Sequence, residues 1–130
     1  MNNAIEKELL ETGVLVLRLN RPEVLNAMNR DLIVGLLNTI NETIDDEKVR
    51  SIVLTGNGRG FCAGADLVDG GWPNEDNLSA GQSAGKNMET AFNPLVKAIT
   101  QSGKPIDSNQ WNCSRWWCWS CLVWRYSNCS

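Results

Sequence analysis

The sequence predicts an α/β fold, and three observations lead to this expectation. Residues 13–19 and 49–55 are two short apolar segments of strand character, and residues 29–44 between them carry apolar side chains at helical spacing. A glycine-rich stretch follows the second segment directly. With 130 residues and 42% hydrophobic content, the chain can bury the core of one domain, so we expect no second domain.

The first strand is expected from Gly13 to Leu19. Its β-branched and leucine side chains fall on both faces, which is typical of a strand buried on both sides. The segment Asn20-Arg21-Pro22 ends this strand, because proline removes a backbone donor and favours a turn.

A helix is expected next, with Asn29 as its N-cap and its end near Ile44. Its apolar side chains form one stripe, which indicates that the helix packs on a core. The stripe consists of Leu32, Ile33, Leu36, Leu37, Ile40 and Ile44. Residues 45–48 are charged and predict a solvated turn, and Val49 to Thr55 is the second strand.

The region from Asp69 to Gly85 is rich in Gly, Asn, Ser and Asp, which predicts a mobile surface lid with one turn of helix near Leu78. Helical spacing returns after it, and Pro94 either kinks this helix or begins a new one. The helical positions are Met88, Ala91, Phe92, Leu95, Val96 and Ile99. Gly103-Lys104-Pro105 ends the helix.

Charge and composition exclude several classes of function. The formal net charge is −3 and the sequence pI is about 4.9, so we expect no nucleic-acid partner and no membrane-surface partner. The chain has no histidine, which excludes Ser-His-Asp and Cys-His catalysis and zinc sites that contain histidine. The polar first residues and the lack of a long apolar run predict a soluble cytoplasmic protein.

Composition changes abruptly between Ile106 and Asp107. One tryptophan and one cysteine precede this point, whereas five tryptophans and four cysteines follow it. We therefore predict a domain over residues 1–106 and an aberrant Trp/Cys-rich tail, disordered or poorly packed, over residues 107–130. Exposed tryptophans in such a tail favour aggregation.

The loop from Gly58 to Leu67 is the main candidate for function. Its small residues leave the backbone accessible, and glycine allows an amide to point outward, where it can bind an oxyanion. The alternative is a tight connection in which small residues only permit close packing. Cys62 is expected to be a small buried residue, because no base lies near it in sequence.

The loop and its surroundings resemble the crotonase superfamily, the enoyl-CoA hydratases and isomerases, over residues 14–106. The matching landmarks are Leu19-Asn20-Arg21-Pro22, Leu25-Asn26-Ala27-Met28, Ile52-Val53-Leu54-Thr55-Gly56, Gly60-Phe61-Cys62-Ala63-Gly64-Ala65-Asp66-Leu67 and Lys104-Pro105. The resemblance implies the N-terminal part of a crotonase-like ββα spiral fold. Asn93-Pro94-Leu95-Val96 is similar to the phenylacetyl-CoA-type isomerase branch.

The resemblance also implies an acyl-CoA substrate whose thioester enolate is stabilised in an oxyanion hole. The backbone N–H of Ala65 is then one donor, and the residues along the coenzyme A path are Leu25, Ala27, Ala63, Gly64, Ala65, Asp66 and Leu67. It implies no metal and no cofactor beyond the coenzyme A of the substrate. Full-length members form trimer-based homo-oligomers, which we do not expect of this chain.

Three charged residues near these landmarks have alternative roles. Asp66 is expected to cap the following helix or to hold the loop rather than to transfer protons. Arg21 and Arg59 could bind coenzyme A phosphates, but solvated surface charges are the default expectation.

The tail departs from the family, which has a glycine-rich segment with the second oxyanion donor after Lys-Pro. Tryptophan has the single codon TGG, so a frame shifted by one base turns each tryptophan into glycine. With permitted codons, the sequence from Asp107 becomes Ile-Ala-Ile-Asn-Gly-Ile-Val-Ala-Gly-Gly-Gly-Val-Gly, and the segment from Trp124 to Asn128 becomes Gly-Asp-Ile-Val-Ile. We hypothesise a frameshift near the Ile106 codon and an inactive product. Coding DNA whose next frame lacks this segment would refute it.

A second function remains open for the tail. The cysteines Cys113, Cys118, Cys121 and Cys129 could together bind zinc, and the tryptophans between them could stack on bases or carbohydrate. The alternative to an acyl-CoA enzyme is therefore a non-catalytic coenzyme A-binding, zinc-binding or interaction module. A disulfide role does not fit a reducing compartment.

Overall fold

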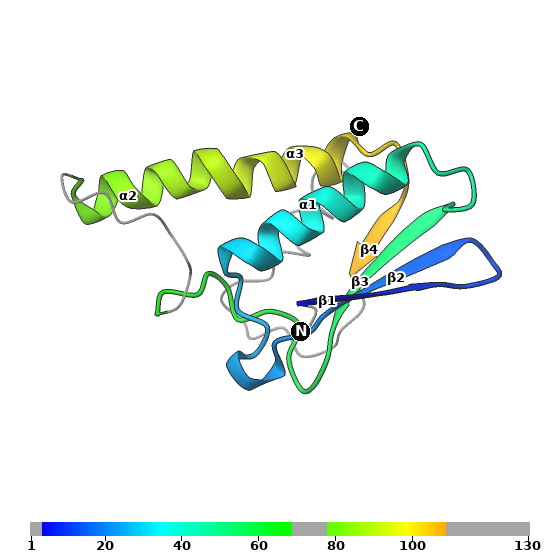
Figure 1. Ribbon diagram of the computed structural model, residues 1–130, viewed down its shortest axis with the longest axis horizontal. Coiled ribbons are helices and arrows are strands. Elements are labelled where there is room, and N and C mark those ends of the chain that lie inside the picture. Colours follow the sequence, from blue (N-terminus) through cyan, green and yellow to red (C-terminus); the bar gives the residue numbers. More distant parts are fainter. Residues whose placement is uncertain (1–3, 69–77, 109–130) are drawn as a thin grey trace.

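The computed structural model describes residues 4–68 and 78–108, which form a four-stranded sheet with helices on one face (Figure 1). The strands are β1 (Ile5–Leu9), β2 (Val14–Leu19), β3 (Ser51–Gly56) and β4 (Ile106–Ser108), in the spatial order β1-β2-β3-β4. The helices are η1 (Pro22–Val24), α1 (Arg30–Ile44), α2 (Ala80–Asn87), η2 (Met88–Phe92) and α3 (Asn93–Gln101). Strand β1 pairs antiparallel with β2, whereas β2 with β3 and β3 with β4 are parallel.

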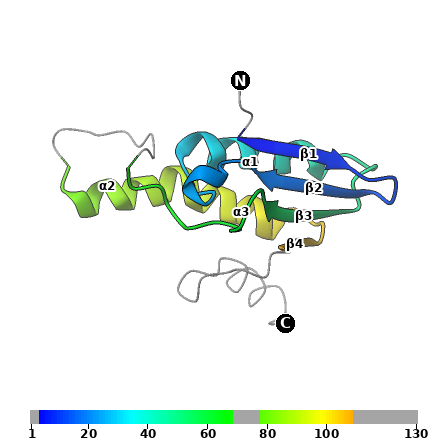
Figure 2. The same ribbon diagram turned by 90° about the horizontal axis from the view of Figure 1, so that it is seen from below.

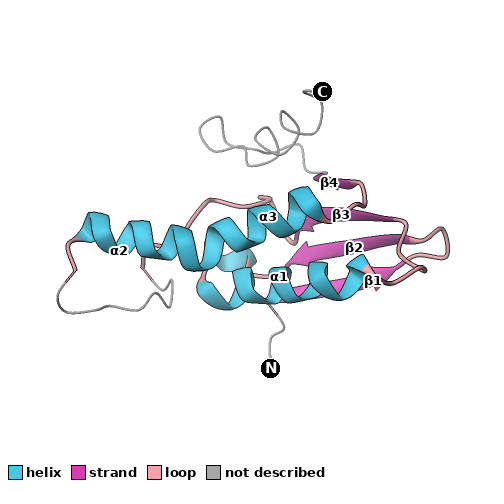
Figure 3. Cartoon of the chain, turned by 90° about the horizontal axis from the view of Figure 1, so that it is seen from above, coloured by secondary structure: helices cyan, strands magenta, loops and turns pink. Residues whose placement is uncertain are grey.

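Helices α1 and α3 lie on the same face of the sheet, as the views from below and above show (Figures 2 and 3). On β2, alternate residues Leu15, Leu17 and Leu19 are buried in the core shared with these helices. The residues between them are only half-buried. The prediction that this strand is buried on both sides is therefore wrong, because the helices of the described part cover one face only.

Helix α1 begins where the sequence predicts. The Asn29 side chain accepts a hydrogen bond from the Leu32 N–H at 3.0 Å, which satisfies one of the unpaired donors at the helix start. Most of the predicted apolar stripe is in the core, namely Leu32, Ile33, Leu36 and Ile40, with Leu37 partly buried. Ile44 is exposed, so its predicted place in the buried stripe is wrong. It lies in the last turn of α1, where the helix extends past the end of the core.

The helical region after the loop begins earlier than predicted. A capping box at Ser79 starts α2: the Ser79 hydroxyl accepts from the Gln82 N–H, and the Gln82 side chain accepts from the Ser79 N–H. Residues 80–85 are thus helical rather than part of a mobile lid, and the rest of the predicted lid, residues 69–77, lies outside the described residues. Helix α2 projects past the sheet (Figure 3).

Pro94 begins a new α-helical segment without ending the helical path. The wide π-helical turn η2 precedes it, and the Asn93 N–H bonds to the Met88 carbonyl oxygen five residues back. Pro94 then lies in the first turn of α3, and the wider turn before it accommodates a residue without an N–H inside one helical path. None of the helices in residues 4–68 and 78–108 is long and apolar enough to cross a membrane.

The Gly103-Lys104-Pro105 segment also fixes the end of α1. Gly103 has φ +68°, and the chain turns there so that Lys104 Nζ donates to the carbonyl oxygens of Thr43 and Asp46, the latter at 2.7 Å. A cation at a helix C-terminus satisfies unpaired carbonyls and complements the helix dipole.

We predict that Lys104→Met lowers the free energy of unfolding by about 1–2 kcal/mol, because both charge-assisted hydrogen bonds are lost. Urea unfolding followed by circular dichroism measures the change. Lys97→Met is the matched control, because Lys97 is exposed on α3. Equal losses in the two variants would contradict the capping role.

Candidate functional site

The glycine-rich loop lies beside the segment that follows η1. Met28 and Ala65 form an isolated parallel bridge, in which the Met28 N–H donates to the Gly64 carbonyl at 2.7 Å and the Asp66 N–H donates to the Met28 carbonyl at 3.0 Å. The Ala63 N–H donates to the Leu25 carbonyl at 3.0 Å. Residues 25–28 and 63–66, which include most of the predicted site, are therefore brought together.

The bridge determines where the Ala65 N–H points. On the loop side, the two hydrogen bonds of the bridge are made by the Gly64 carbonyl and the Asp66 N–H, which belong to the neighbours of Ala65. The N–H and C=O of Ala65 itself are therefore directed away from residues 25–28. Ala65 is exposed, and no acceptor for its N–H is found within residues 4–68 and 78–108. This N–H can therefore donate to a ligand.

Asn26 connects the two segments through its side chain, which is fully buried. Its Oδ1 accepts from the Arg21 N–H at 2.8 Å, and its Nδ2 donates to the carbonyl oxygens of Asn57 at 3.0 Å and Gly60 at 2.7 Å. Asn26 and Leu25 both have left-handed φ values, 55° and 52°, which residues other than glycine adopt only where their surroundings hold them.

Gly56, the last residue of β3, allows this arrangement because it has no side chain. A Cβ at this position would lie 2.5 Å from Asn26 Nδ2 and 2.6 Å from the Phe61 carbonyl oxygen. The turn from the strand into the loop passes so close to Asn26 that only glycine fits.

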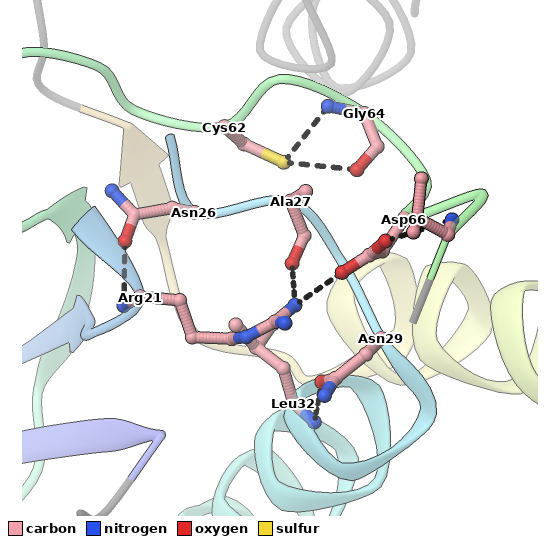
Figure 4. Close-up of polar contacts among 9 residues, drawn as sticks. Arg21, Asn26, Ala27, Asn29, Leu32, Cys62, Gly64 and Asp66 are labelled. Atoms are coloured by element: carbon pink, nitrogen blue, oxygen red, sulfur yellow. Dashed lines mark hydrogen bonds and ion pairs between the residues drawn. The ribbon is translucent and has the colours of Figure 1, made fainter. Parts of the chain in front are cut away.

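Arg21 and Asp66 form a buried ion pair below the loop (Figure 4). Arg21 Nη1 lies 3.0 Å from Asp66 Oδ2 and donates to the Ala27 carbonyl oxygen at 2.6 Å. The side chains of Arg21 and Asp66 are only 13% and 7% exposed. Arg21 is therefore not the solvated surface charge that the sequence predicted, because the loop folds over it.

Asp66 holds the loop. Its Oδ1 accepts from the Val68 N–H at 3.1 Å, which closes a local turn, while its Oδ2 contacts Arg21. The residues predicted to line the coenzyme A path differ in exposure: Ala63, Ala65 and Leu67 are exposed, Leu25 and Gly64 are intermediate, and Ala27 and Asp66 are buried.

Cys62 lies within the loop and is partly buried against the core. Its sulfur is 3.4 Å from the Gly64 N–H donor and 3.8 Å from the Gly64 carbonyl oxygen. Burial raises the pKa of the Cys62 thiol, and the hydrogen bond with the Gly64 backbone opposes this only in part. A thiol with a raised pKa is a poor nucleophile at neutral pH.

We predict that alkylation of Cys62 by iodoacetamide has a pH midpoint above that of the same residue in the unfolded chain. Because the folded pKa is the higher one, the contribution of this group to stability is complete below the unfolded pKa and declines as pH rises through the folded pKa. Peptide-resolved mass spectrometry separates Cys62 from the four tail cysteines, and guanidinium-unfolded chain is the control. A folded midpoint at or below the unfolded one would contradict the burial argument.

Within the described ranges, no three His, Cys, Asp or Glu side chains are grouped so that they could hold a metal ion. The cysteines of the alternative zinc site belong to residues 109–130, which lie outside these ranges, as do the tryptophans of the tail. Asp107 and Ser108, which the sequence assigned to the tail, are the last residues of β4.

Comparison with known proteins gives one family. The family model described as enoyl-CoA hydratase/isomerase matches residues 10–108. The chain is 39% identical over 97 residues to 1,2-epoxyphenylacetyl-CoA isomerase of Escherichia coli K12, covering 75% of this chain and 36% of that protein. It is 46% identical over 54 residues to 2,3-dehydroadipyl-CoA hydratase of the same organism, covering 42% of this chain and 21% of that protein.

Solved structures agree with this result. An enoyl-CoA hydratase from Mycobacterium smegmatis has a TM-score of 0.69 at 26% identity, over 82% of this chain and 39% of that one. An enoyl-CoA hydratase/isomerase from Pseudoalteromonas atlantica T6c has a TM-score of 0.62 at 32% identity, over 82% of this chain and 38% of that one. The predicted partial crotonase-like α/β fold is confirmed, and the chain spans well under half the length of these relatives. The chain belongs to the enoyl-CoA hydratase/isomerase family.

Proposed function

We propose that this chain binds an acyl-CoA thioester and that the Ala65 N–H donates a hydrogen bond to the thioester carbonyl oxygen. The outward direction of this N–H is the observation that carries the proposal, because the bridge between Met28 and Ala65 leaves it without a partner in the described part of the chain. A preorganised donor of this kind stabilises the negative oxygen of an enolate.

The surroundings of Ala65 support the same proposal. Ala63, Gly64 and Ala65 have little or no side chain, so a ligand can approach the backbone closely. Leu67 is 90% exposed and offers an apolar contact beside the donor. In this proposal Leu25, Ala27 and Asp66 contribute mainly through backbone atoms and by holding the loop.

The frameshift hypothesis implies a parent enzyme, in which the shifted reading frame replaces the tail of this chain. For this parent enzyme, we favour an isomerase or another thioester reaction over simple hydration. The relative with 39% identity is named as an isomerase acting on 1,2-epoxyphenylacetyl-CoA. The shifted reading of the tail places no carboxylate in the glycine-rich segment, where hydratases of this family usually carry a glutamate.

For this chain, the proposal is binding with little or no turnover. Residues 107–130 do not contain the glycine-rich pattern that would supply the second donor. Loss of one oxyanion donor typically slows turnover by about 10²–10³-fold.

The test is a titration of the full chain with crotonyl-CoA and with S-butyl-CoA, a thioether that lacks the carbonyl oxygen. We expect crotonyl-CoA to bind more tightly than the thioether by up to about tenfold, the value of one hydrogen bond. Hydration and isomerisation assays, run beside a zinc determination, should show little turnover. Equal affinity for the two ligands would contradict the carbonyl contact, and stoichiometric zinc without thioester binding would favour the alternative module.

A further inference from the structure

Among the ion pairs within residues 4–68 and 78–108, the Arg21–Asp66 pair is the most deeply buried. Both side chains are almost removed from solvent, at 13% and 7% exposure. Burial of two charges carries a desolvation cost that is offset only by close pairing and further hydrogen bonds. Arg21 has such a bond to the Ala27 carbonyl oxygen, and Asp66 has one from the Val68 N–H.

The position of the pair relates it to the candidate donor. Asp66 directly follows Ala65, and its own N–H forms one of the two bonds of the Met28–Ala65 bridge. Arg21 contacts the carbonyl of Ala27, the residue before Met28. The pair therefore ties together the two segments of the bridge (Figure 4).

The peptide that carries the donor is held by the bridge itself. The Gly64 carbonyl oxygen accepts from the Met28 N–H at 2.7 Å, and the Ala65 N–H lies in the same planar peptide, so this bond sets its direction. Gly64 has φ +108°, and a Cβ built there would meet nothing within 4 Å, so no side-chain packing at Gly64 adds to this restraint. The direction of the Ala65 N–H therefore depends on the bridge, whose two segments the Arg21–Asp66 pair ties together.

We propose that Arg21 and Asp66 are positioning residues that keep the Ala65 N–H directed toward the thioester carbonyl of the ligand. This inference rests on the proposed function and adds the residues that orient the donor. Preorganisation matters here, because a donor that is already aligned loses no energy to reorientation when charge develops on the oxygen.

The experiment follows the Ala65 amide by NMR in ¹⁵N-labelled full chain during titration with crotonyl-CoA. In the wild type we expect a downfield shift of the Ala65 amide proton. Arg21→Met should remove this shift and weaken binding by up to about tenfold. Arg21→Lys, which keeps the charge, should restore part of both effects. The matched control is Arg18→Met, which removes the exposed 2.7 Å pair with Glu8 on β1 and β2 and should leave the Ala65 shift unchanged.

Arg21→Met leaves a buried charge unpaired and is expected to lower stability, so the double variant Arg21→Met/Asp66→Asn is measured beside it. A folded double variant that loses the Ala65 shift supports the positioning role. A folded single or double variant with the full wild-type shift would overturn it. If Ala65 does not respond in the wild type although crotonyl-CoA binds, the proposed donor is wrong, which distinguishes failure of the function from failure of the positioning role.

Discussion

Replacing the Ala65 amide by an ester is expected to abolish polarisation of a bound thioester while leaving the fold intact. The ester, made with L-lactic acid in place of alanine, keeps the methyl group, removes the N–H and leaves the Gly64 carbonyl in place as a weaker acceptor for the Met28 N–H. Ligation at Cys62 joins residues 1–61 to a synthetic segment that carries the ester. With 4-dimethylaminocinnamoyl-CoA, we expect the wild type to red-shift the ligand absorbance and the ester variant to lose this shift. In an active parent enzyme, the same change should lower kcat by about 10²–10³-fold.

The control is the equivalent ester at Ala63. The Ala63 N–H donates to the Leu25 carbonyl, so this ester should lower the free energy of unfolding by about 0.5–1.5 kcal/mol. The Ala65 ester should lower stability less, because the Ala65 N–H has no acceptor in the described residues and the Met28 N–H to Gly64 carbonyl bond is weakened but not removed. A red shift retained by the Ala65 ester, or equal destabilisation by both esters, would contradict the assignment of a ligand-facing donor.

Gly56→Ala is expected to cause the largest loss of stability, about 3 kcal/mol or more. The new Cβ would lie 2.5 Å from Asn26 Nδ2, 2.6 Å from the Phe61 carbonyl oxygen and 2.7 Å from the Gly60 carbonyl oxygen. Two of these three atoms are backbone, so the clash cannot be relieved by rotation of one side chain. Thermal and urea unfolding measure the effect.

Gly85→Ala provides the matched control with the opposite sign. Gly85 lies within α2, and a Cβ there would meet nothing within 4 Å. Alanine should therefore stabilise the protein by about 0.5–1 kcal/mol through its higher helix propensity. Similar stabilities for the two variants would show that the loop does not pack against Asn26 as described.

The parts of the fold that sequence could predict are those set by local signals. Asn29 caps α1 because a short polar side chain precedes an apolar helical period, and both features are visible in sequence. Strand β1 was not predicted, because only Ile5 of its five residues is buried, so the segment has no alternating apolar pattern. Its strand conformation depends instead on antiparallel pairing with β2, a contact that local sequence does not reveal. The start of α2 had a local signal in Ser79 and Gln82, which the polar composition of the region obscured.

The site was only partly predictable, for a related reason. The small residues of the loop indicate an accessible backbone, and the resemblance to the crotonase superfamily then implied Ala65 as the donor. Two polar residues hold the loop. The sequence predicted a solvated surface charge for Arg21 and assigned Asn26 no role beyond its place in a family landmark. Asn26 is instead bonded to carbonyls 31 and 34 residues away, so its role depends on contacts that only the fold creates.

The most direct measurement is a crystal structure of the full chain with bound crotonyl-CoA. Our account predicts the thioester carbonyl oxygen about 2.7–3.1 Å from the Ala65 nitrogen, with the Met28–Ala65 bridge intact. A bound thioester whose oxygen is held by another group, while the Ala65 N–H points to a protein acceptor, would contradict it.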